Sequence, residues 1–373
     1  MGDNQQREAA EVSPFLAKAV ACPLCELVSP QRRIKRHLYQ EQKRDIDLKP
    51  LSYHWKGKGL TVQHPLIHFL WHCPGCRFTA WPGAWENPIR GTGLTLTKYR
   101  AALRDLPGQD PADAKVRALL LQGWTWPELD YEQGLRLHLL AVHQLLLLKK
   151  ATGALDSLNL GRYCLRLAWL FRELGERPEL SPTATRMAQL AGRLRPLWPE
   201  APLDDAGALR AAAGFYEIGA TDAQAVEDVG ELCNLLLLIT RIHLKLRQFD
   251  PAKRYLGRAH ELTRNLEQRK QQMEGAYYQL EQRARSEARA VSELARKRQQ
   301  EVSAQIVELD SKFRGMRFKV QDVRELLQDE MDAPPPGRTA ATQVSDAQAP
   351  DEDFLDLDLS LKPKKKRLRD LFK

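Results

Sequence analysis

The chain has 373 residues, of which 43% are apolar and 28% charged, and its net charge is +9. This length suits two domains, or one domain with long appendages, and the composition supplies enough apolar residues for a sizeable core. The first 21 residues contain no apolar run of signal-peptide length, and the longest apolar runs, at 145–148 and 235–239, are far too short to cross a bilayer. These observations argue against secretion and membrane insertion, and we expect a cytoplasmic protein.

Residues 1–17 are mostly polar, and we expect them to be disordered. The segment 18–93 that follows contains two matched motifs, Cys-Pro-Leu-Cys at 22–25 and Cys-Pro-Gly-Cys at 73–76. Each has the form of a zinc knuckle, and two knuckles supply the four thiolates of a closed tetrahedral site. We therefore predict a β-rich module held by structural Zn²⁺. The predicted ligands are Cys22, Cys25, Cys73 and Cys76.

Two other interpretations of these motifs are weaker. A redox pair of the thioredoxin type needs a βαβ pattern, which this segment lacks. A catalytic zinc site keeps one coordination position open for water, whereas four cysteines already fill a tetrahedral ion. The nearby histidines are therefore expected to be packing or surface residues, with His72 the one to watch because it adjoins Cys73. The five are His37, His54, His64, His68 and His72.

The remaining two cysteines, Cys164 and Cys233, stand singly within apolar helical patterns. A lone cysteine in such a pattern usually packs in the core. Six cysteines in a chain of 373 residues do not indicate a disulfide framework. Reduced thiols and a zinc site both suit the cytosol.

A basic stretch at 31–58 adjoins the first knuckle and accounts for much of the net charge. With Tyr39, Tyr53 and Trp55 nearby, it has the composition of a surface that binds nucleic acid through phosphate contacts and base stacking. The alternative is a solvated face with no ligand, which we prefer. The candidate contact residues are Arg32, Arg33, Lys35 and Arg36.

Residues 94–260 have helical periodicity, and we expect one domain there. A Leu-rich segment at 131–150 precedes a second helix at 156–175, and the segment around 251–259 begins another helix after a turn. Two such helix pairs resemble tetratricopeptide repeats, although the repeat period is imperfect. An ordinary helical bundle is the alternative.

Residues 261–332 are predicted to form one long coiled-coil helix. Apolar residues recur from Val302 to Leu327 in alternating steps of four and three, which is a heptad seam. Glu287 and Arg298 occupy seam positions further upstream, so a weak point is expected near 298–302. Because such a helix cannot cover its own seam, it needs a partner, a second copy or a returning helix. We expect self-association through residues 262–330.

The segment 333–373 is expected to be a disordered tail that docks a protein partner. Residues 351–361 alternate acidic and apolar side chains, and residues 362–369 form a basic run. Isolated apolar anchors in a polar tail are typical of docking peptides. The candidate anchors are Phe354, Leu355, Leu357, Leu371 and Phe372.

Three segments together resemble a known bacterial family, the domain of unknown function 2225. They are 20–25 around the first knuckle, the Lys-Arg-Asp-Ile-Asp stretch at 43–47, and 64–78 around the second knuckle. The resemblance covers roughly residues 18–260 and implies metal binding at the four cysteines, tetratricopeptide-like helices and a bacterial cytosolic setting. It implies no activity. The chain departs from the family's usual glycine after the second knuckle, where Arg77 stands.

These features predict a mainly α protein with a small zinc-stapled β-rich module, a tetratricopeptide-like helical domain, a long coiled-coil helix and a disordered tail. No glycine-rich phosphate loop, His-Glu-x-x-His motif or nucleophile elbow is present in the sequence. We therefore expect a non-enzymatic scaffold or adaptor that binds protein partners. The alternative is a zinc-ribbon protein that binds nucleic acid through the basic stretch.

Overall fold

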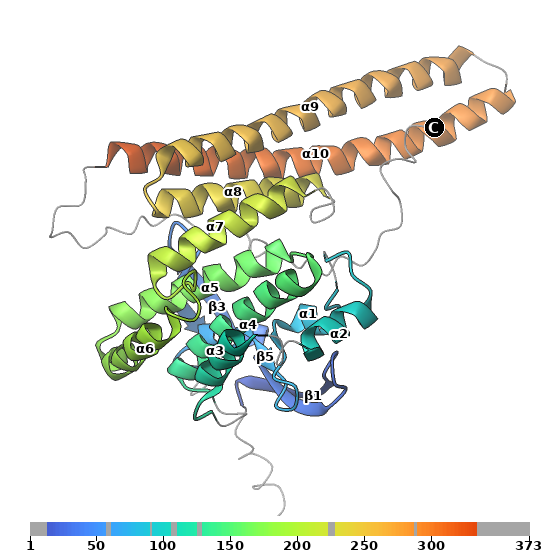
Figure 1. Cartoon of the computed structure of the whole chain (residues 1–373). Helices are drawn as coiled ribbons and strands as arrows, with labels where there is room; N and C mark the ends of the chain where they lie inside the picture. The colour runs from blue at the N-terminus through green and yellow to red at the C-terminus, as the bar shows by residue number, and fades with distance from the viewer. Residues whose placement is uncertain are drawn as a thin grey trace, which may run out of the picture. The chain divides into compact units, whose positions relative to one another are not determined.

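The computed structural model describes residues 13–56, 61–89, 92–105, 110–124, 129–222, 228–286 and 289–333 (Figure 1). Within them the predicted fold class is confirmed, because short strands are confined to the N-terminal module and helices form most of the rest. The strands are β1 (Phe15–Ala21), β2 (Val28–Ile34), β3 (Tyr39–Arg44), β4 (Pro50–Trp55), β5 (Trp71–His72) and β6 (Thr79–Ala80). The helices are α1 (Pro82–Glu86), α2 (Leu96–Asp105), α3 (Pro111–Leu121), α4 (Tyr131–Thr152), α5 (Ser157–Glu176), α6 (Ser181–Leu194), α7 (Asp205–Thr221), α8 (Val229–Lys245), α9 (Phe249–Ser286) and α10 (Arg289–Asp332).

The chain divides into two compact units, and the boundary falls between Tyr216 and Glu217, inside α7. The boundary predicted from sequence lay at 260/261, at the start of the heptad segment. The difference arises because α8 and the first turns of α9 pack with α10. They therefore belong to the second unit and not to the helical domain expected over 94–260.

Three antiparallel hairpins form the β-rich module of the first unit: β1–β2, β3–β4 and β5–β6. The buried side chain of Gln31 on β2 joins the β1–β2 hairpin to the β5–β6 hairpin by bonding to both backbone groups of one residue, as a neighbouring strand would. Its Nε2 donates to the carbonyl oxygen of His72 at 2.9 Å, and its Oε1 accepts from the His72 amide at 3.2 Å. A second link runs from the Trp71 indole to the Arg32 carbonyl oxygen at 3.2 Å. Side chains thus supply bonds that a continuous sheet would supply from its backbone.

Helices α4 and α5 form the core of the first unit and confirm one of the two helix pairs predicted from sequence. Helix α4 begins at a capping box, in which the Asp130 and Gln133 side chains each bond to the other's backbone amide. It ends before Gly153, whose φ of 74° suits glycine. Trp169 is fully buried on α5. The likeness of these helices to tetratricopeptide repeats stays a prediction.

A buried ion network holds the β3–β4 loop on α5. The Arg172 guanidinium contacts Asp47 through two nitrogens, at 3.0 and 2.8 Å, and Asp45 at 2.8 Å. It also bonds to Asp205 at the start of α7 through two contacts of 3.0 Å. Asp47 is fully buried and accepts a further bond from the Trp169 indole at 3.2 Å. The two aspartates of the stretch at 43–47 therefore have a structural role, which is to anchor the β-rich module on the helices.

The second unit consists chiefly of α8, α9 and α10, and the last two lie side by side in opposite directions (Figure 1). The heptad seam of α10 faces this bundle, and Phe313, Met316, Val320, Val323 and Leu327 are buried there. Polar contacts fix the register: Lys270 of α9 pairs with Asp310, and Arg241 of α8 pairs with Asp322 at 2.6 Å. The seam is thus filled within the chain.

The predicted long C-terminal helix is present as α10, but the range 261–332 holds parts of two helices instead of one. Of the three ways to cover the seam, the structure has the returning helix. Helix α10 is continuous through 298–302, where the weak point was expected. Helix α9 runs back along α10 and packs against it. The heptad spacing by itself could not distinguish a returning helix from a second copy.

None of the helices in the described ranges combines the length and the apolar character that a membrane span requires. The docking anchors predicted in the tail, from Phe354 to Phe372, lie outside the described residues.

Substitution of Arg172 by methionine is expected to destabilise the first unit by about 3–5 kcal/mol, because Asp47 is left buried without its counterion. The measurement is urea unfolding followed by tryptophan fluorescence. Arg177→Met is the matched control, since Arg177 makes more exposed ion pairs with Glu173 and Glu179, worth at most about 1 kcal/mol. Equal losses of stability in the two variants would contradict the anchoring role of Arg172.

Candidate metal centre

The four predicted cysteine ligands converge at one place. Their Sγ atoms all lie within 4.8 Å of one another. The closest approaches run between the two knuckles: Cys22 to Cys76 and Cys25 to Cys73, each at 3.5 Å. A tetrahedral ion with Zn–S bonds of about 2.3 Å requires sulfurs about 3.8 Å apart. The arrangement therefore has the dimensions of a tetrathiolate site, and all six cysteines of the chain are free of disulfides.

Both knuckles sit at the tip of a hairpin and have the same backbone geometry. In the first, the Cys22 amide donates to the Leu27 carbonyl oxygen at 3.0 Å, and in the second the Cys73 amide donates to that of Phe78 at 2.8 Å. The residue after the last cysteine is left-handed in each, with φ of 63° at Glu26 and 67° at Arg77. Arg77, which stands where the family usually has glycine, therefore adopts a left-handed conformation at a cost in backbone strain. Because the two turns have the same geometry, the four sulfurs converge on one point.

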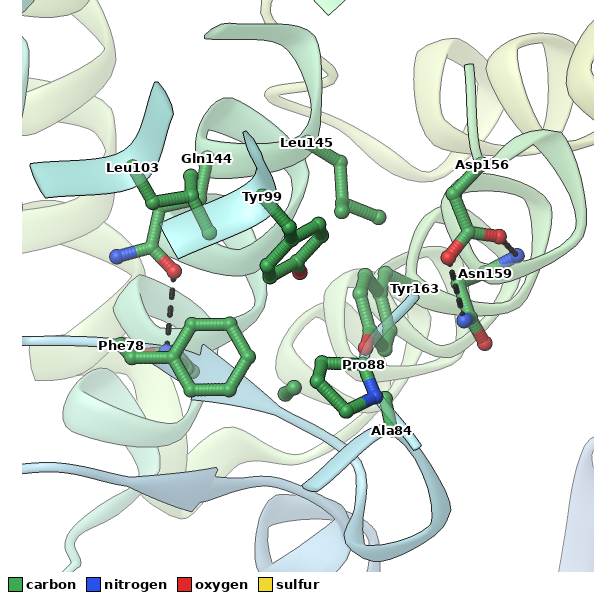
Figure 2. A pocket seen from close by; sticks show the side chains of 12 residues that line it. Phe78, Ala84, Pro88, Tyr99, Leu103, Gln144, Leu145, Asp156, Asn159 and Tyr163 are labelled. Atoms are coloured by element: carbon green, nitrogen blue, oxygen red, sulfur yellow. Dashed lines mark hydrogen bonds between the residues drawn. The ribbon is translucent and has the colours of Figure 1, made fainter. Parts of the chain in front are cut away.

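The helices hold each knuckle in place by bonding to its backbone. Arg100 of α2 donates through Nε to the Pro23 carbonyl oxygen at 2.7 Å. Gln144 of α4 donates to the Arg77 carbonyl oxygen at 2.6 Å. It also accepts from the Thr79 amide at 3.0 Å (Figure 2). The roles of Arg100 and Gln144 were not predicted from the sequence. The only signal for Gln144 was a polar residue inside the apolar run of α4, and Arg100 carried none.

The electrostatics of the cluster favour a bound cation. Contact with neighbouring thiols raises the pKa of Cys22 to about 12 and lowers the pKa of Cys73, so ionisation of one of these two thiols opposes ionisation of the other. A coordinated metal ion deprotonates its thiol ligands and removes this opposition. A divalent ion with four thiolates carries a net charge of −2, and cations lie nearby. Burial lowers the pKa of Arg117 on α3 and the charge of Cys76 raises it, and its buried Nε has no hydrogen-bond partner within the described part of the chain.

No histidine belongs to this cluster among the described residues. The His72 ring is held by Thr79, with Nδ1 to Oγ1 at 2.8 Å, and burial lowers its pKa to about 3. Burial likewise lowers the pKa of His68 to about 4. His64 contacts Glu173 at 3.3 Å, and His37 and His54 are exposed. The candidate ligand atoms are therefore four sulfurs, which is the number that a tetrahedral ion binds.

The basic stretch lies on the same hairpin as the first knuckle. Arg32 and Arg33 are exposed on β2, Arg36 is exposed beyond its end, and Lys35 is half-buried. The aromatic residues proposed to stack on bases instead contact one another, with ring centroids 5.4–6.5 Å apart. These three are Tyr39, Tyr53 and Trp55. Part of the predicted nucleic-acid surface is thus occupied by its own packing.

The other two cysteines are fully buried and do not belong to the cluster. Burial raises the pKa of Cys164, and it raises the pKa of Cys233 to about 11. Both therefore stay protonated near neutral pH, as core residues do. This is the environment expected from their positions in apolar helical patterns.

A pocket between β6, α1, α2, α4 and α5 has room for about one water molecule (Figure 2). Asp156 forms part of its wall, and burial raises the pKa of this carboxyl group. The carboxylate accepts from the Asn159 amide at 3.2 Å and from its Nδ2 at 2.7 Å, so it caps α5. Asp156 is thus committed to the fold, and the space beside it is too small for a substrate.

The purified chain is expected to bind one Zn²⁺, and its Co²⁺ form should show the absorption of a site with four thiolates. Cys25→Ser should lose the metal and expose the β-rich module to proteolysis, because small metal-stabilised modules depend on the ion for folding. His54→Ala is the control and should keep the metal. A mixed nitrogen and sulfur spectrum, or full metal content in Cys25→Ser, would contradict the tetrathiolate assignment.

Substitution at Arg77 tests the strain in the second knuckle. Because its side chain is exposed and its φ is 67°, Arg77→Gly should be more stable than Arg77→Ala by about 1 kcal/mol. The same pair of substitutions at Arg193, exposed in α6, should have the opposite order by about 1 kcal/mol. Thermal unfolding of the metal-loaded chains gives the comparison. The same order at both positions would exclude strain at Arg77.

The chain was also compared with known proteins. A family model described as an uncharacterised protein conserved in bacteria (DUF2225) matches residues 15–302. No curated protein and no solved structure matches the chain. The matched range contains both knuckles, the buried ion network and the helices up to the first turns of α10.

Proposed function

The chain belongs to the bacterial family DUF2225, and we propose that it acts as a non-enzymatic adaptor whose metal site is structural and whose helices bind protein partners. The observation that carries this proposal is the ligand set. Four cysteine sulfurs satisfy a tetrahedral Zn²⁺ completely, so the ion would hold two hairpins together and offer no open position for catalysis. The chemistry of such a site is cross-linking of the fold.

The surface of the second unit supports the binding role. Although the heptad seam is filled, large apolar residues remain outside it. On α10, Val307 is 67% exposed and Phe318 is 75% exposed. They are separated by eleven residues, which is close to three helical turns, so they lie on one face. Ser311 and Gly315 lie between them and are also exposed. Exposed apolar side chains aligned on one face are typical of binding surfaces.

This face changes the surface through which self-association is expected. The seam residues of 302–327 contact α8 and α9, so a second copy would bind through the outer face of α10. The exposed residues Val307, Ser311, Gly315 and Phe318 form the α10 outer face. The proposal also includes protein partners that bind the helix pairs and the tail.

The test combines two substitutions, Val307→Ser and Phe318→Ser, in the full chain. Loss of such apolar anchors should weaken self-association or partner binding at least about tenfold. The solution mass across a concentration series and co-purification from the native host give the readouts. Arg317→Ser is the matched control, because Arg317 is an exposed neighbour outside the α10 outer face. Identical masses and identical co-purified proteins in all three chains would contradict a binding role for this face.

Nucleic-acid binding is the second candidate, and one observation favours it: Arg32 and Arg33 are exposed on the β1–β2 hairpin, which carries Cys22 and Cys25, without an acidic partner among the described residues. It would appear as salt-dependent retention on a polyanion column. Charge reversal at Arg32, Arg33, Lys35 and Arg36 should then abolish the retention. Unchanged retention would remove this candidate.

A further inference from the structure

The edge of β1 that faces away from β2 is open to pairing with another strand. Hairpin β1–β2 is a two-stranded sheet, and the strands pair from Phe15 with Ile34 to Ala21 with Val28. Bonds at both ends define the ladder: the Lys35 amide donates to the Pro14 carbonyl oxygen, and the Cys22 amide donates to that of Leu27. Because bonded and non-bonded pairs alternate in an antiparallel ladder, every second residue of β1 points its amide and carbonyl away from β2. These residues are Phe15, Ala17, Ala19 and Ala21.

No strand covers that edge among the described residues. The three alanines are exposed, and across the hairpin they share a face with Val28, which is 61% exposed, with Pro30 and with the exposed Arg32. Small side chains keep the edge accessible to another backbone. An exposed edge of this kind is a template for an added strand.

The opposite face of the hairpin carries two cations. Lys18 and Arg33 are exposed there, and neither has an acidic partner among the described residues. Leu16 lies beside Arg33 across the ladder and is also exposed. The edge therefore has one face of alanine, valine and proline with Arg32 beside Ala17, and a second face that carries Lys18 and Arg33.

One segment of the chain has the matching pattern. From Leu355 to Leu361 leucine occupies every second position, and Asp356, Asp358 and Ser360 occupy the positions between. Since side chains of a strand point alternately to its two faces, residues 355–361 present leucine on one side and Asp356, Asp358 and Ser360 on the other when extended. Asp351 and Asp353 precede the leucines on their side, and the whole segment 351–361 carries five acidic residues and no basic one. Its leucines match the alanine face of the β1 edge, and its acidic residues match the cations on both faces.

We propose that residues 351–361 of the same chain add to the open edge of β1 as a third strand. The leucines cover the alanine face beside Val28, and Asp356 and Asp358 approach Lys18 and Arg33. The added strand bonds to the backbone of Ala17, Ala19 and Ala21. This inference concerns a different surface from the α10 outer face, so either proposal can fail without the other.

Hydrogen exchange of the β1 amides in the full chain tests this pairing. In the metal-loaded protein, a variant with Leu355→Ser, Leu357→Ser and Leu359→Ser should exchange the amides of Ala17, Ala19 and Ala21 about tenfold faster than the wild type. The control variant, Leu371→Ser with Phe372→Ser, alters the other tail anchors and should leave those rates unchanged. Metal content and exchange in α4 report that each variant is folded. Equal exchange in the wild type and the leucine variant, or equal acceleration by the control, overturns the proposal.

Charge exchange gives a second readout. Lys18→Glu with Arg33→Glu should also accelerate exchange of the three alanine amides, and Asp356→Lys with Asp358→Lys in the same chain should restore it. Protection that depends on protein concentration would indicate pairing with a second copy and would overturn the proposal. Polyanion retention that is the same in the wild type and the leucine variant would show that the cationic face is open in both, which also overturns it.

Discussion

The convergence of four cysteine sulfurs is the constraint on which the N-terminal module depends. Its hairpins are short, and a two-stranded hairpin alone is marginally stable in water. The sulfurs of Cys22 and Cys76, and of Cys25 and Cys73, meet only when the β1–β2 and β5–β6 tips face each other. Gln31 then completes the backbone bonding between those hairpins, and Gln144 fixes the second knuckle to α4. A metal ion in the cluster would therefore hold a module that lacks the apolar area to hold itself.

The two units are stabilised by different means. The first combines the cysteine cluster with a buried ion network, in which Arg172 satisfies Asp47 at a position without access to water. A buried pair of this kind fixes position more than it adds stability, because desolvation offsets much of its attraction. The second unit has apolar seams between α8, α9 and α10, with Arg241 and Lys270 setting the register at its surface. Each unit has its own core.

The side chains considered for a function already have structural partners. Cys22, Cys25, Cys73 and Cys76 lie in one cluster, Asp156 caps a helix, and His72 bonds to Thr79. Two exposed features remain outside these contacts: the backbone edge of β1 and the apolar side chains of the α10 outer face. Exposed features of this kind are typical of binding surfaces. Membership of DUF2225 is consistent with this interpretation and names no activity.

The sequence by itself determined the ligand cluster, the α4–α5 pair and the presence of a long C-terminal helix, because each is written in local spacing: Cys-x-x-Cys turns, helical periodicity and heptads. Only the tertiary structure decided which elements these patterns pack against. A heptad seam shows that a helix needs a packing partner, and in this structure the partner is the returning helix α9. The sequence could not identify that partner, because a helix of the same chain and a helix of another chain can bury an apolar stripe equally well. The contacts between Arg172 and Asp47, and those of Gln31 and Gln144, also could not be predicted from the sequence. Each depends on a partner far away along the chain, and the chemistry of a single polar residue does not specify that partner.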